Sequence, residues 1–102
     1  MASRKKNLSP KDIEQIFEWV TAAVSLLGDI LSKEGETVIQ GRRIAYIIRP
    51  KVKGFTLKWY SKVTDLQSGI EDRADNYKKD KGALEHALAN LVTSLKREEI
   101  IP

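Results

Sequence analysis

The spacing of the apolar residues changes along the chain, and this change limits the folds available to it. From Ile13 to Leu31, apolar residues recur every three or four positions, as on one face of an α-helix. From about residue 36 to residue 64 they alternate with polar residues, as in strands with one buried face. Helical spacing returns over 83–98. This order predicts an α+β fold.

The first helix has a clear start signal in the sequence. Ser9 is a good N-cap residue, Pro10 suits the first helical position, and Asp12 lies three residues after Ser9, as in a capping box. Gly35 is typical of the residue that follows a helix end. The sequence therefore predicts a long N-terminal helix over 10–33.

A three-stranded antiparallel β-meander is expected to follow. The predicted strands are 36–39, 42–49 and 55–64. A Gln40-Gly41 turn joins the first two, and Pro50 is expected to end the second because it has no N–H for the ladder. Residues 51–54 would form the next turn. Along the third strand, four apolar residues are expected to face the covering helices: Phe55, Leu57, Trp59 and Val63.

The last third of the chain is expected to be one long C-terminal helix or a broken one. Asp65 is a candidate N-cap for this helix, and the polar stretch before Gly82 is a candidate break. A small sheet needs cover on its apolar face, so the long helices are expected to pack there. The opposite face of the sheet would then be exposed to solvent.

Length and composition are those of one small globular domain. The chain has 102 residues, of which 41% are hydrophobic and 31% are charged. We expect a flexible basic tail over 1–8, a single α+β domain over 9–98 and a frayed C-terminus over 99–102. No stretch resembles a signal peptide or a membrane span, so the expected location is cytoplasmic.

The residues that usually carry catalysis are scarce. The chain has no cysteine and a single histidine, His86, which excludes cysteine-based zinc sites and disulfide scaffolds. The glycines are too dispersed for a phosphate-binding loop. Glu71 and Asp75 would share one face of the predicted second helix, most simply as a solvated acidic face. We expect no enzyme activity, no metal site and no cofactor.

The strongest functional signal is the distribution of charge. The net charge is only +4, yet residues 37–64 contain no acidic residue. Arg43, Arg49, Lys58 and Lys62 are expected on the exposed sheet face, with Tyr60 between the two lysines. Such a face attracts phosphate backbones, and an aromatic ring among cations can stack on a base. The predicted nucleic-acid contacts are Arg42, Arg43, Arg49, Lys51, Lys53, Lys58, Tyr60 and Lys62.

Two other interpretations of this charge stay open. Lysines and arginines on exposed strands also prevent aggregation, and a basic face would equally fit an acidic protein partner. The order of helix, three strands and helix is shared with double-stranded RNA-binding domains, in which lysines near the last helix meet phosphates. That parallel is one of topology only, with Lys78, Lys79 and Lys81 in the corresponding place. Strand type and natural partner stay open.

The first helix is a second candidate surface. Its apolar arc extends beyond the main stripe, which would suit a partner protein or a homodimer, or burial between sheet and last helix. The candidate interface residues are Trp19, Ala22, Ala23 and Leu26. A membrane partner is not expected, because the polar positions of this helix are acidic. The sequence thus predicts a small accessory protein that binds nucleic acid or a protein, and a phage, plasmid or mobile-element origin would fit this role.

Overall fold

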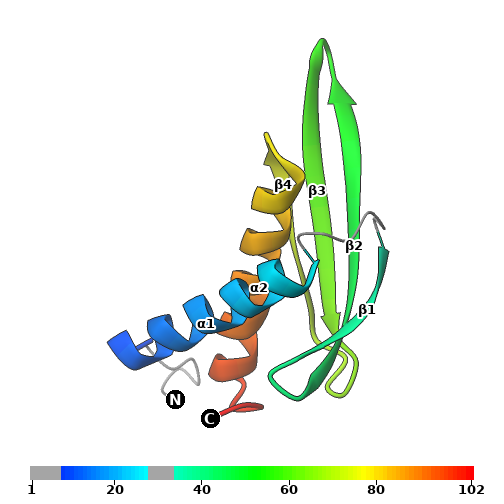
Figure 1. Ribbon diagram of the computed structural model, residues 1–102. Helices are drawn as coiled ribbons and strands as arrows, with labels where there is room; N and C mark the ends of the chain where they lie inside the picture. The colour runs from blue at the N-terminus through cyan, green and yellow to red at the C-terminus, as the bar shows by residue number, and fades with distance from the viewer. Residues whose placement is uncertain (1–7, 28–33) are drawn as a thin grey trace, which may run out of the picture.

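The computed structural model describes residues 8–27 and 34–102 (Figure 1). Along the chain, one helix comes first, the four strands of an antiparallel sheet follow, and a second helix comes last. The elements are α1 (Pro10–Leu27), β1 (Glu34–Ile39), β2 (Arg42–Lys53), β3 (Thr56–Asp65), β4 (Glu71–Tyr77) and α2 (Asp80–Arg97). The strands lie in the order β1-β2-β3-β4. The predicted α+β class is confirmed, but the sheet has four strands instead of three.

The fourth strand occupies a stretch for which we predicted a helix. Asp65 caps no helix: it ends β3 and accepts hydrogen bonds from the Ser68 N–H and hydroxyl, at 3.1 and 2.6 Å, within a tight turn. Gly69 takes a φ of 81° in that turn. β4 then pairs with β3 and buries Ala74 opposite Ser61. The apolar residues of this stretch fit a helical stripe, but the open edge of β3 decides the outcome.

β2 and β3 form a longer hairpin than the sequence suggested. Gln40 and Gly41 make the predicted turn between β1 and β2, both with positive φ as a type I′ turn requires. The expectation that Pro50 ends β2 is wrong, because the strand continues to Lys53. β1 pairs with β2 only as far as residue 47, so Pro50 lies where one side of β2 is an open edge, and edges tolerate proline.

The turn of this long hairpin consists of Gly54 and Phe55 alone. Lys53 pairs directly with Thr56, and Gly54 has a φ of 62° at the first turn position, where type II′ turns place glycine. The predicted turn over 51–54 is therefore displaced toward the C-terminus, and Phe55 belongs to the turn instead of the strand.

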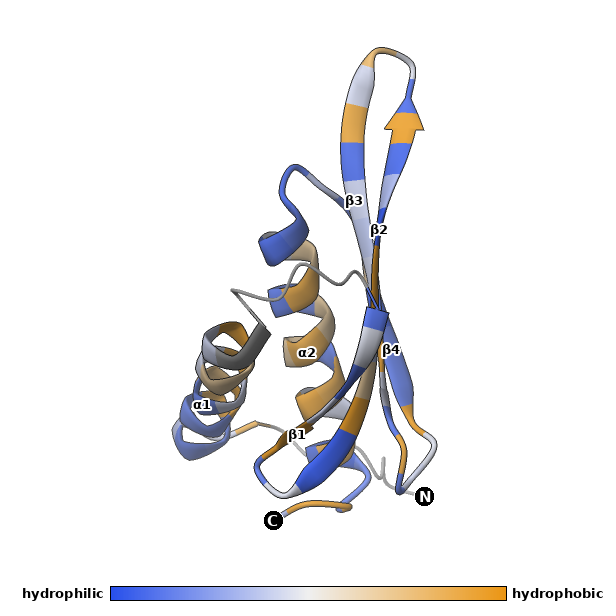
Figure 2. Cartoon of the chain, turned by 45° about the vertical axis from the view of Figure 1, so that its right-hand side comes forward, coloured by the Kyte–Doolittle hydropathy of each residue, from blue (hydrophilic) through white to orange (hydrophobic). Residues whose placement is uncertain are grey.

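The sheet is covered by one helix and not by two. α2 packs on the inner face of β2, β3 and β4, whereas α1 lies across α2 and reaches only β1 of the sheet (Figure 2). The core lies between α2 and the sheet, and α1 closes one side of it. Its largest fully buried apolar side chains are Ile39, Ile44, Val63, Leu88, Leu91, Val92 and Leu95. The prediction that both helices cover the sheet is therefore wrong.

The start of α1 follows the sequence closely. The Ser9 N–H donates to Asp12 Oδ2 at 2.9 Å, and the Asp12 N–H donates to Ser9 Oγ at 3.2 Å, which is the predicted reciprocal cap. The Lys96 ammonium, from the last turn of α2, lies 2.8 Å from Asp12 Oδ1. A hydrogen bond from that lysine and the bond from the Ser9 main chain lower the pKa of Asp12 to about 2.

The end of α1 differs from the expectation. The helix ends at Leu27, and residues 28–33 of the predicted helix lie outside the described part of the chain, as does most of the predicted basic tail. Gly35 lies within β1 opposite Tyr46, where an added Cβ would be 2.9 Å from the tyrosine oxygen. This glycine permits close packing of an aromatic side chain instead of ending a helix.

Two of the candidate interface residues of α1 belong to the core. Trp19 and Ala23 are buried, Ala22 is half-buried, and the side chain of Leu26 lies outside the described residues. A homodimer through this helix stays a prediction. At the other end of the chain, Ile101 is buried against the core, so the part of 99–102 around it is packed.

Candidate functional site

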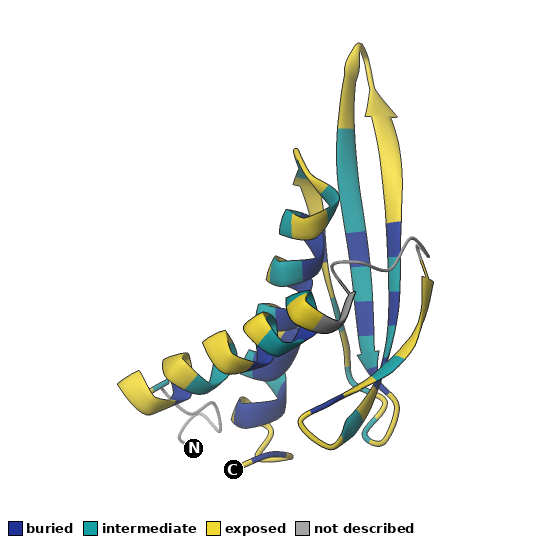
Figure 3. Ribbon diagram, viewed as in Figure 1, coloured by how far each residue is buried: buried dark blue, intermediate teal, exposed yellow. Residues whose placement is uncertain are grey.

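The β2–β3 hairpin projects well beyond the rest of the molecule (Figure 1). Its inward-facing residues are buried beneath α2 as far as Ile48 on β2 and Ser61 on β3. Beyond these positions Trp59 is half-buried and still packs against the core, whereas exposed residues occupy the end of the hairpin (Figure 3). We call residues 49–60 the hairpin tip.

The pairing of β2 with β3 divides the hairpin tip into two faces. Residues paired across an antiparallel ladder point to the same side of the sheet. The outer face, which we call the cationic face, contains the pairs Arg49–Tyr60, Lys51–Lys58 and Lys53–Thr56. The inner face, which we call the apolar face, contains the pairs Pro50–Trp59 and Val52–Leu57. The hairpin tip is therefore amphipathic.

The apolar face is uncovered toward its end. Val52 is 76% exposed and Leu57 is 50% exposed, while Phe55 in the turn is fully exposed. Single exposed apolar residues are common on proteins, but large apolar side chains gathered in one exposed patch mark an interaction site. The sequence placed Phe55 and Leu57 beneath helices, and that expectation is wrong because α2 begins too far from the turn to reach them.

Tyr60 lies in the middle of the cationic face. Its partner across the ladder is Arg49, and its neighbours on the same face of β3 are Lys58 and Lys62. The Lys51 ammonium nitrogen lies 5.7 Å from the centre of the tyrosine ring. A hollow of about 460 Å³ opens here, lined by Arg49, Pro50, Lys51, Tyr60, Arg73 and Asp75.

Like charges face each other beside this hollow. Lys51 lies directly opposite Lys58, and Lys62 lies directly opposite Arg73 of β4. Such cross-strand pairs destabilise a sheet. Within residues 8–27 and 34–102, Lys53, Lys58 and Lys62 form no ion pair. The cationic face thus retains repulsion that an anionic ligand would relieve.

Acidic residues of the outer strands reach the same face. The pairs are Arg43–Glu36 and Arg49–Glu34, both at 2.7 Å, Lys51–Asp75 at 2.9 Å and Arg73–Glu71 at 3.0 Å. The hydrogen bond from Lys51 lowers the pKa of Asp75. The run without acids in the sequence is therefore partly neutralised in space, because β1 and β4 flank it. Exposed pairs of this kind are weak.

The structure separates Arg42 from the other candidate contacts. Arg43, Arg49, Lys58 and Lys62 share the outer face as expected, whereas the Arg42 guanidinium points to Asp65, with nitrogen–oxygen distances of 3.0 and 2.8 Å. Asp65 is fully buried. Burial opposes ionisation of this carboxyl, but hydrogen bonds from Arg42 and Ser68 prevail and lower its pKa. Arg42 thus belongs to a structural ion pair.

The remaining residues that the sequence singled out for possible chemistry are His86, Glu71 and Asp75. The His86 ring stacks on Tyr77 with centroids 4.4 Å apart, and its Nδ1 lies 2.9 Å from the Gly82 carbonyl oxygen. Glu71 and Asp75 lie on a strand and not on the predicted helix. Over the described residues, no group of three or more possible metal ligands occurs.

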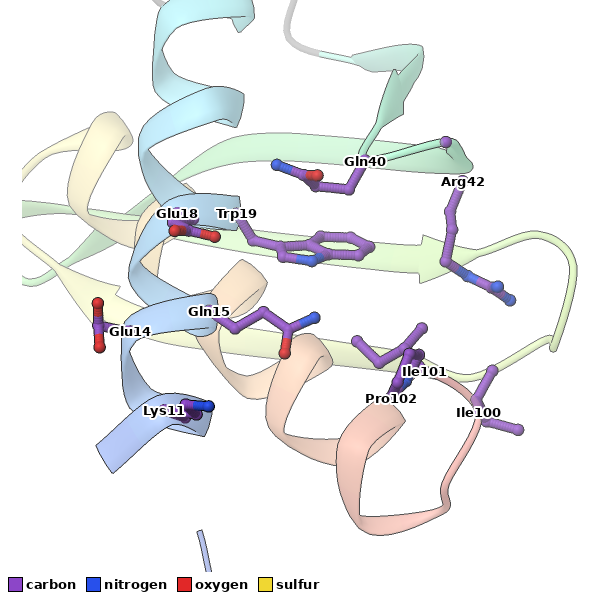
Figure 4. A pocket seen from close by; sticks show the side chains of 11 residues that line it. Lys11, Glu14, Gln15, Glu18, Trp19, Gln40, Arg42, Ile100, Ile101 and Pro102 are labelled. Atoms are coloured by element: carbon purple, nitrogen blue, oxygen red, sulfur yellow. The ribbon is translucent and has the colours of Figure 1, made fainter. Parts of the chain in front are cut away.

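A larger hollow, of about 670 Å³, lies between α1, the β1–β2 turn and the C-terminal residues (Figure 4). Trp19 forms its floor, and Glu14, Glu18 and Arg42 are among its lining residues. Both signs of charge line it, so it favours no class of ligand.

None of the described helices has the length and apolar character needed to span a bilayer.

Comparison with known proteins identifies a fold and no family. No protein-family model matches the chain, and a search of curated proteins finds no relative. Among solved structures, the chain is similar to an antilipopolysaccharide factor from shrimp, whose solution structure was reported with its possible lipid A binding site. The TM-score is 0.65 at 14% identity, over 90% of this chain and 86% of that chain. The likeness establishes the shared architecture of two helices and four strands.

Proposed function

We propose that this protein is a non-enzymatic binding protein that docks on anionic lipid surfaces through its hairpin tip. The observation that carries the proposal is the pairing of exposed apolar side chains with lysines at one end of the molecule. A bilayer interface offers both chemistries in adjacent layers, since acyl chains lie just beneath a layer of phosphates. The tip presents both to a single flat surface.

The apolar side chains would supply the hydrophobic part of the binding free energy. Burial of one large apolar side chain contributes roughly 1.5–3 kcal/mol. Phe55 lies at the extreme end of the hairpin, with Val52 and Leu57 beside it on the inner face. Penetration by these three residues would require no change in the fold, because they are already outside the core.

The lysines would supply the electrostatic part. Lys53 flanks the turn. Lys51 and Lys58 face each other on the same outer face, two positions farther from the turn. Long lysine side chains can direct their ammonium groups to the phosphate layer while their methylenes follow the apolar surface. Each basic residue near an anionic membrane contributes about 1 kcal/mol. The two faces of the tip therefore act together.

The fold comparison agrees with this ligand class. The shrimp protein of similar architecture was described with a possible binding site for lipid A. Identity of 14% relates the folds alone, so the proposal rests on the residues of this hairpin. Our expectation of no membrane partner was based on the acidic polar face of α1 and took no account of the β2–β3 hairpin.

Nucleic acid is the second candidate ligand, supported by the cationic face around Tyr60. A polyanion would use the cations and the tyrosine ring, as the sequence predicted. It would not explain why Phe55, Val52 and Leu57 are exposed at the tip. The four carboxylates that reach the same face also reduce its attraction for a long polyanion. An acidic protein partner stays a third prediction.

The test is co-sedimentation with vesicles of phosphatidylcholine alone and with 20% phosphatidylglycerol. We expect binding to the anionic vesicles, and at least about a tenfold loss for the double variant Phe55→Ser, Leu57→Ser, since it removes two exposed apolar side chains that would enter the bilayer. Phe17→Ser is the matched control, because Phe17 is equally apolar and 72% exposed but lies on α1. Equal losses in both variants would exclude the hairpin tip as the docking element.

A second arm compares lipid with nucleic acid by fluorescence anisotropy of labelled single- and double-stranded DNA and RNA. Tight oligonucleotide binding that is abolished by Lys58→Glu with Lys62→Glu, and unchanged by the serine double variant, would favour the nucleic-acid function. We expect the opposite result: the protein binds anionic vesicles more tightly than oligonucleotides, and the serine double variant loses its vesicle binding.

A further inference from the structure

We propose that the hollow around Tyr60 binds a phosphate monoester group. This inference goes beyond the proposed function, because the hollow opens on the cationic face, away from Val52, Phe55 and Leu57, and includes Arg73 of β4. It rests on the proposed function only where the ester belongs to a lipid headgroup. The chemistry is the same for a soluble ester, and the experiment separates the two sources.

The hollow brings three cations around one tyrosine. Arg49 and Lys51 come from β2, Arg73 comes from β4, and Tyr60 lies on β3 between them. A phosphate monoester carries a charge of about −1.5 to −2 and three strong acceptor oxygens. Two guanidinium groups offer planar, paired donors for such oxygens, and the ammonium adds a point charge. The volume of about 460 Å³ accommodates a phosphate with part of its alcohol group.

Each of these cations is already held by one carboxylate. Arg49 pairs with Glu34, Lys51 with Asp75, and Arg73 with Glu71. All three pairs are exposed, and an exposed ion pair contributes only about 0–1 kcal/mol. A dianion that contacts all three cations can therefore displace the carboxylates at small cost. In the free protein, the same carboxylates keep the long side chains positioned.

The surroundings favour a doubly charged group over a singly charged one. Lys58 lies opposite Lys51, and Lys62 lies opposite Arg73, so the cations of the hollow have further cations as neighbours. Among the described residues, Asp75 is the one acid that lines the hollow itself. The attraction for an anion scales with its charge, which favours a monoester over the singly charged diester of a nucleic-acid backbone.

The test measures the preference for phosphatidic acid, a monoester, over phosphatidylglycerol, a diester, at 20% in phosphatidylcholine vesicles. We expect the unmodified protein to prefer phosphatidic acid by at least about fivefold, as one added charge-assisted contact would provide. Arg73→Gln should remove this preference. Arg43→Gln is the matched control, since both arginines are 61% exposed and pair with one glutamate on the same face. It should retain the preference.

A variant that gains affinity gives a second, independent readout. Asp75→Asn removes the acid that competes for Lys51, so we expect about twofold to fivefold tighter binding to phosphatidic acid. A general effect of charge would raise binding to phosphatidylglycerol by the same factor. Equal factors for the two lipids, or equal losses in Arg73→Gln and Arg43→Gln, would overturn the proposal.

The source of the ester is identified by nuclear magnetic resonance titration with glycerol 3-phosphate. Shifts at Tyr60 and Arg73 that saturate, and that inorganic sulfate does not reproduce, show that a soluble ester suffices. If only phosphatidic acid vesicles cause the shifts, the ester is a lipid headgroup. If neither ligand moves Tyr60, the inference fails, while vesicle binding that depends on Phe55 would leave the proposed function standing. Saturable glycerol 3-phosphate binding without any vesicle binding would support the phosphate site and exclude the proposed docking on lipid surfaces.

Discussion

The two halves of the β2–β3 hairpin have the same strand pattern and opposite environments. Near α2, the inward residues Ile44, Tyr46 and Ile48 are buried in the core. Farther along the same face, Val52 and Leu57 continue the alternation but are exposed. The strands, the ladder and the apolar character are the same in both halves. The difference is that α2 and the outer strands β1 and β4 flank only the first half.

This difference separates stability from function. The covered half contributes the hydrophobic burial that holds the fold together. The uncovered half adds little to stability, and its exposed apolar residues and like-charge pairs would favour aggregation or repulsion if they had no partner. We therefore assign binding to the uncovered half. Three predictions test the contrast between the two halves, and a fourth tests the contact between α1 and α2.

The largest expected effect comes from the buried ion pair of the covered half. Arg42→Met should lower the free energy of unfolding by about 3–5 kcal/mol, because it leaves the buried carboxylate of Asp65 without its cation. Arg49→Met, in the hairpin tip, removes an exposed pair with Glu34 and should cost less than about 1 kcal/mol. Urea unfolding measures both. Similar losses for the two arginines would break the contrast.

The next effect compares two apolar truncations on the same face. Ile44→Ala should destabilise the protein by about 2–5 kcal/mol through lost burial and a residual cavity. Val52→Ala should change stability by no more than about 0.5 kcal/mol, because Val52 is already exposed. Thermal and urea unfolding provide the values. A loss above about 1 kcal/mol for Val52→Ala would show that the tip is covered in solution.

A third prediction concerns how stability falls at acidic pH through the Asp12–Lys96 contact between α1 and α2. The pKa of Asp12 is about 2 in the folded chain against an ordinary value of 3.8, so its stabilising effect is complete above about pH 4 and declines as the pH falls toward 2. Asp12→Asn should reduce stability at pH 7 and flatten its dependence on pH between 4 and 2. Melting temperature against pH is the measurement. An unchanged slope would exclude the Lys96 contact as the cause.

The smallest expected change in stability has the opposite sign. Lys58→Glu replaces the repulsion between Lys58 and Lys51 by attraction and should stabilise the fold by about 0.2–1 kcal/mol. The same change should weaken binding to anionic vesicles, because it reverses a charge of the hairpin tip. Lys78→Glu is the matched control for net charge, since Lys78 lies outside the hairpin. Weaker binding together with weaker stability would point to misfolding instead.

Local signals in the sequence predicted local structure well. The capping box at Ser9, the Gln40-Gly41 turn and the apolar stripe of the last helix depend on residues a few positions apart, and all three are present. The strand for β4 was missed because its pattern also fits a helix, and only the open edge of β3 favours a strand. Pro50 was misread because its tolerance depends on where β1 ends.

The sequence by itself determined that the chain forms an α+β domain with basic central strands, since propensity, periodicity and charge are properties of neighbouring residues. Only the tertiary structure decided which parts of those strands are covered. It placed the carboxylates of β1 and β4 beside the cations, and it left Phe55, Val52 and Leu57 without a helix above them. Cover and charge pairing depend on residues far apart in the chain, so they follow from how α2 and the outer strands pack.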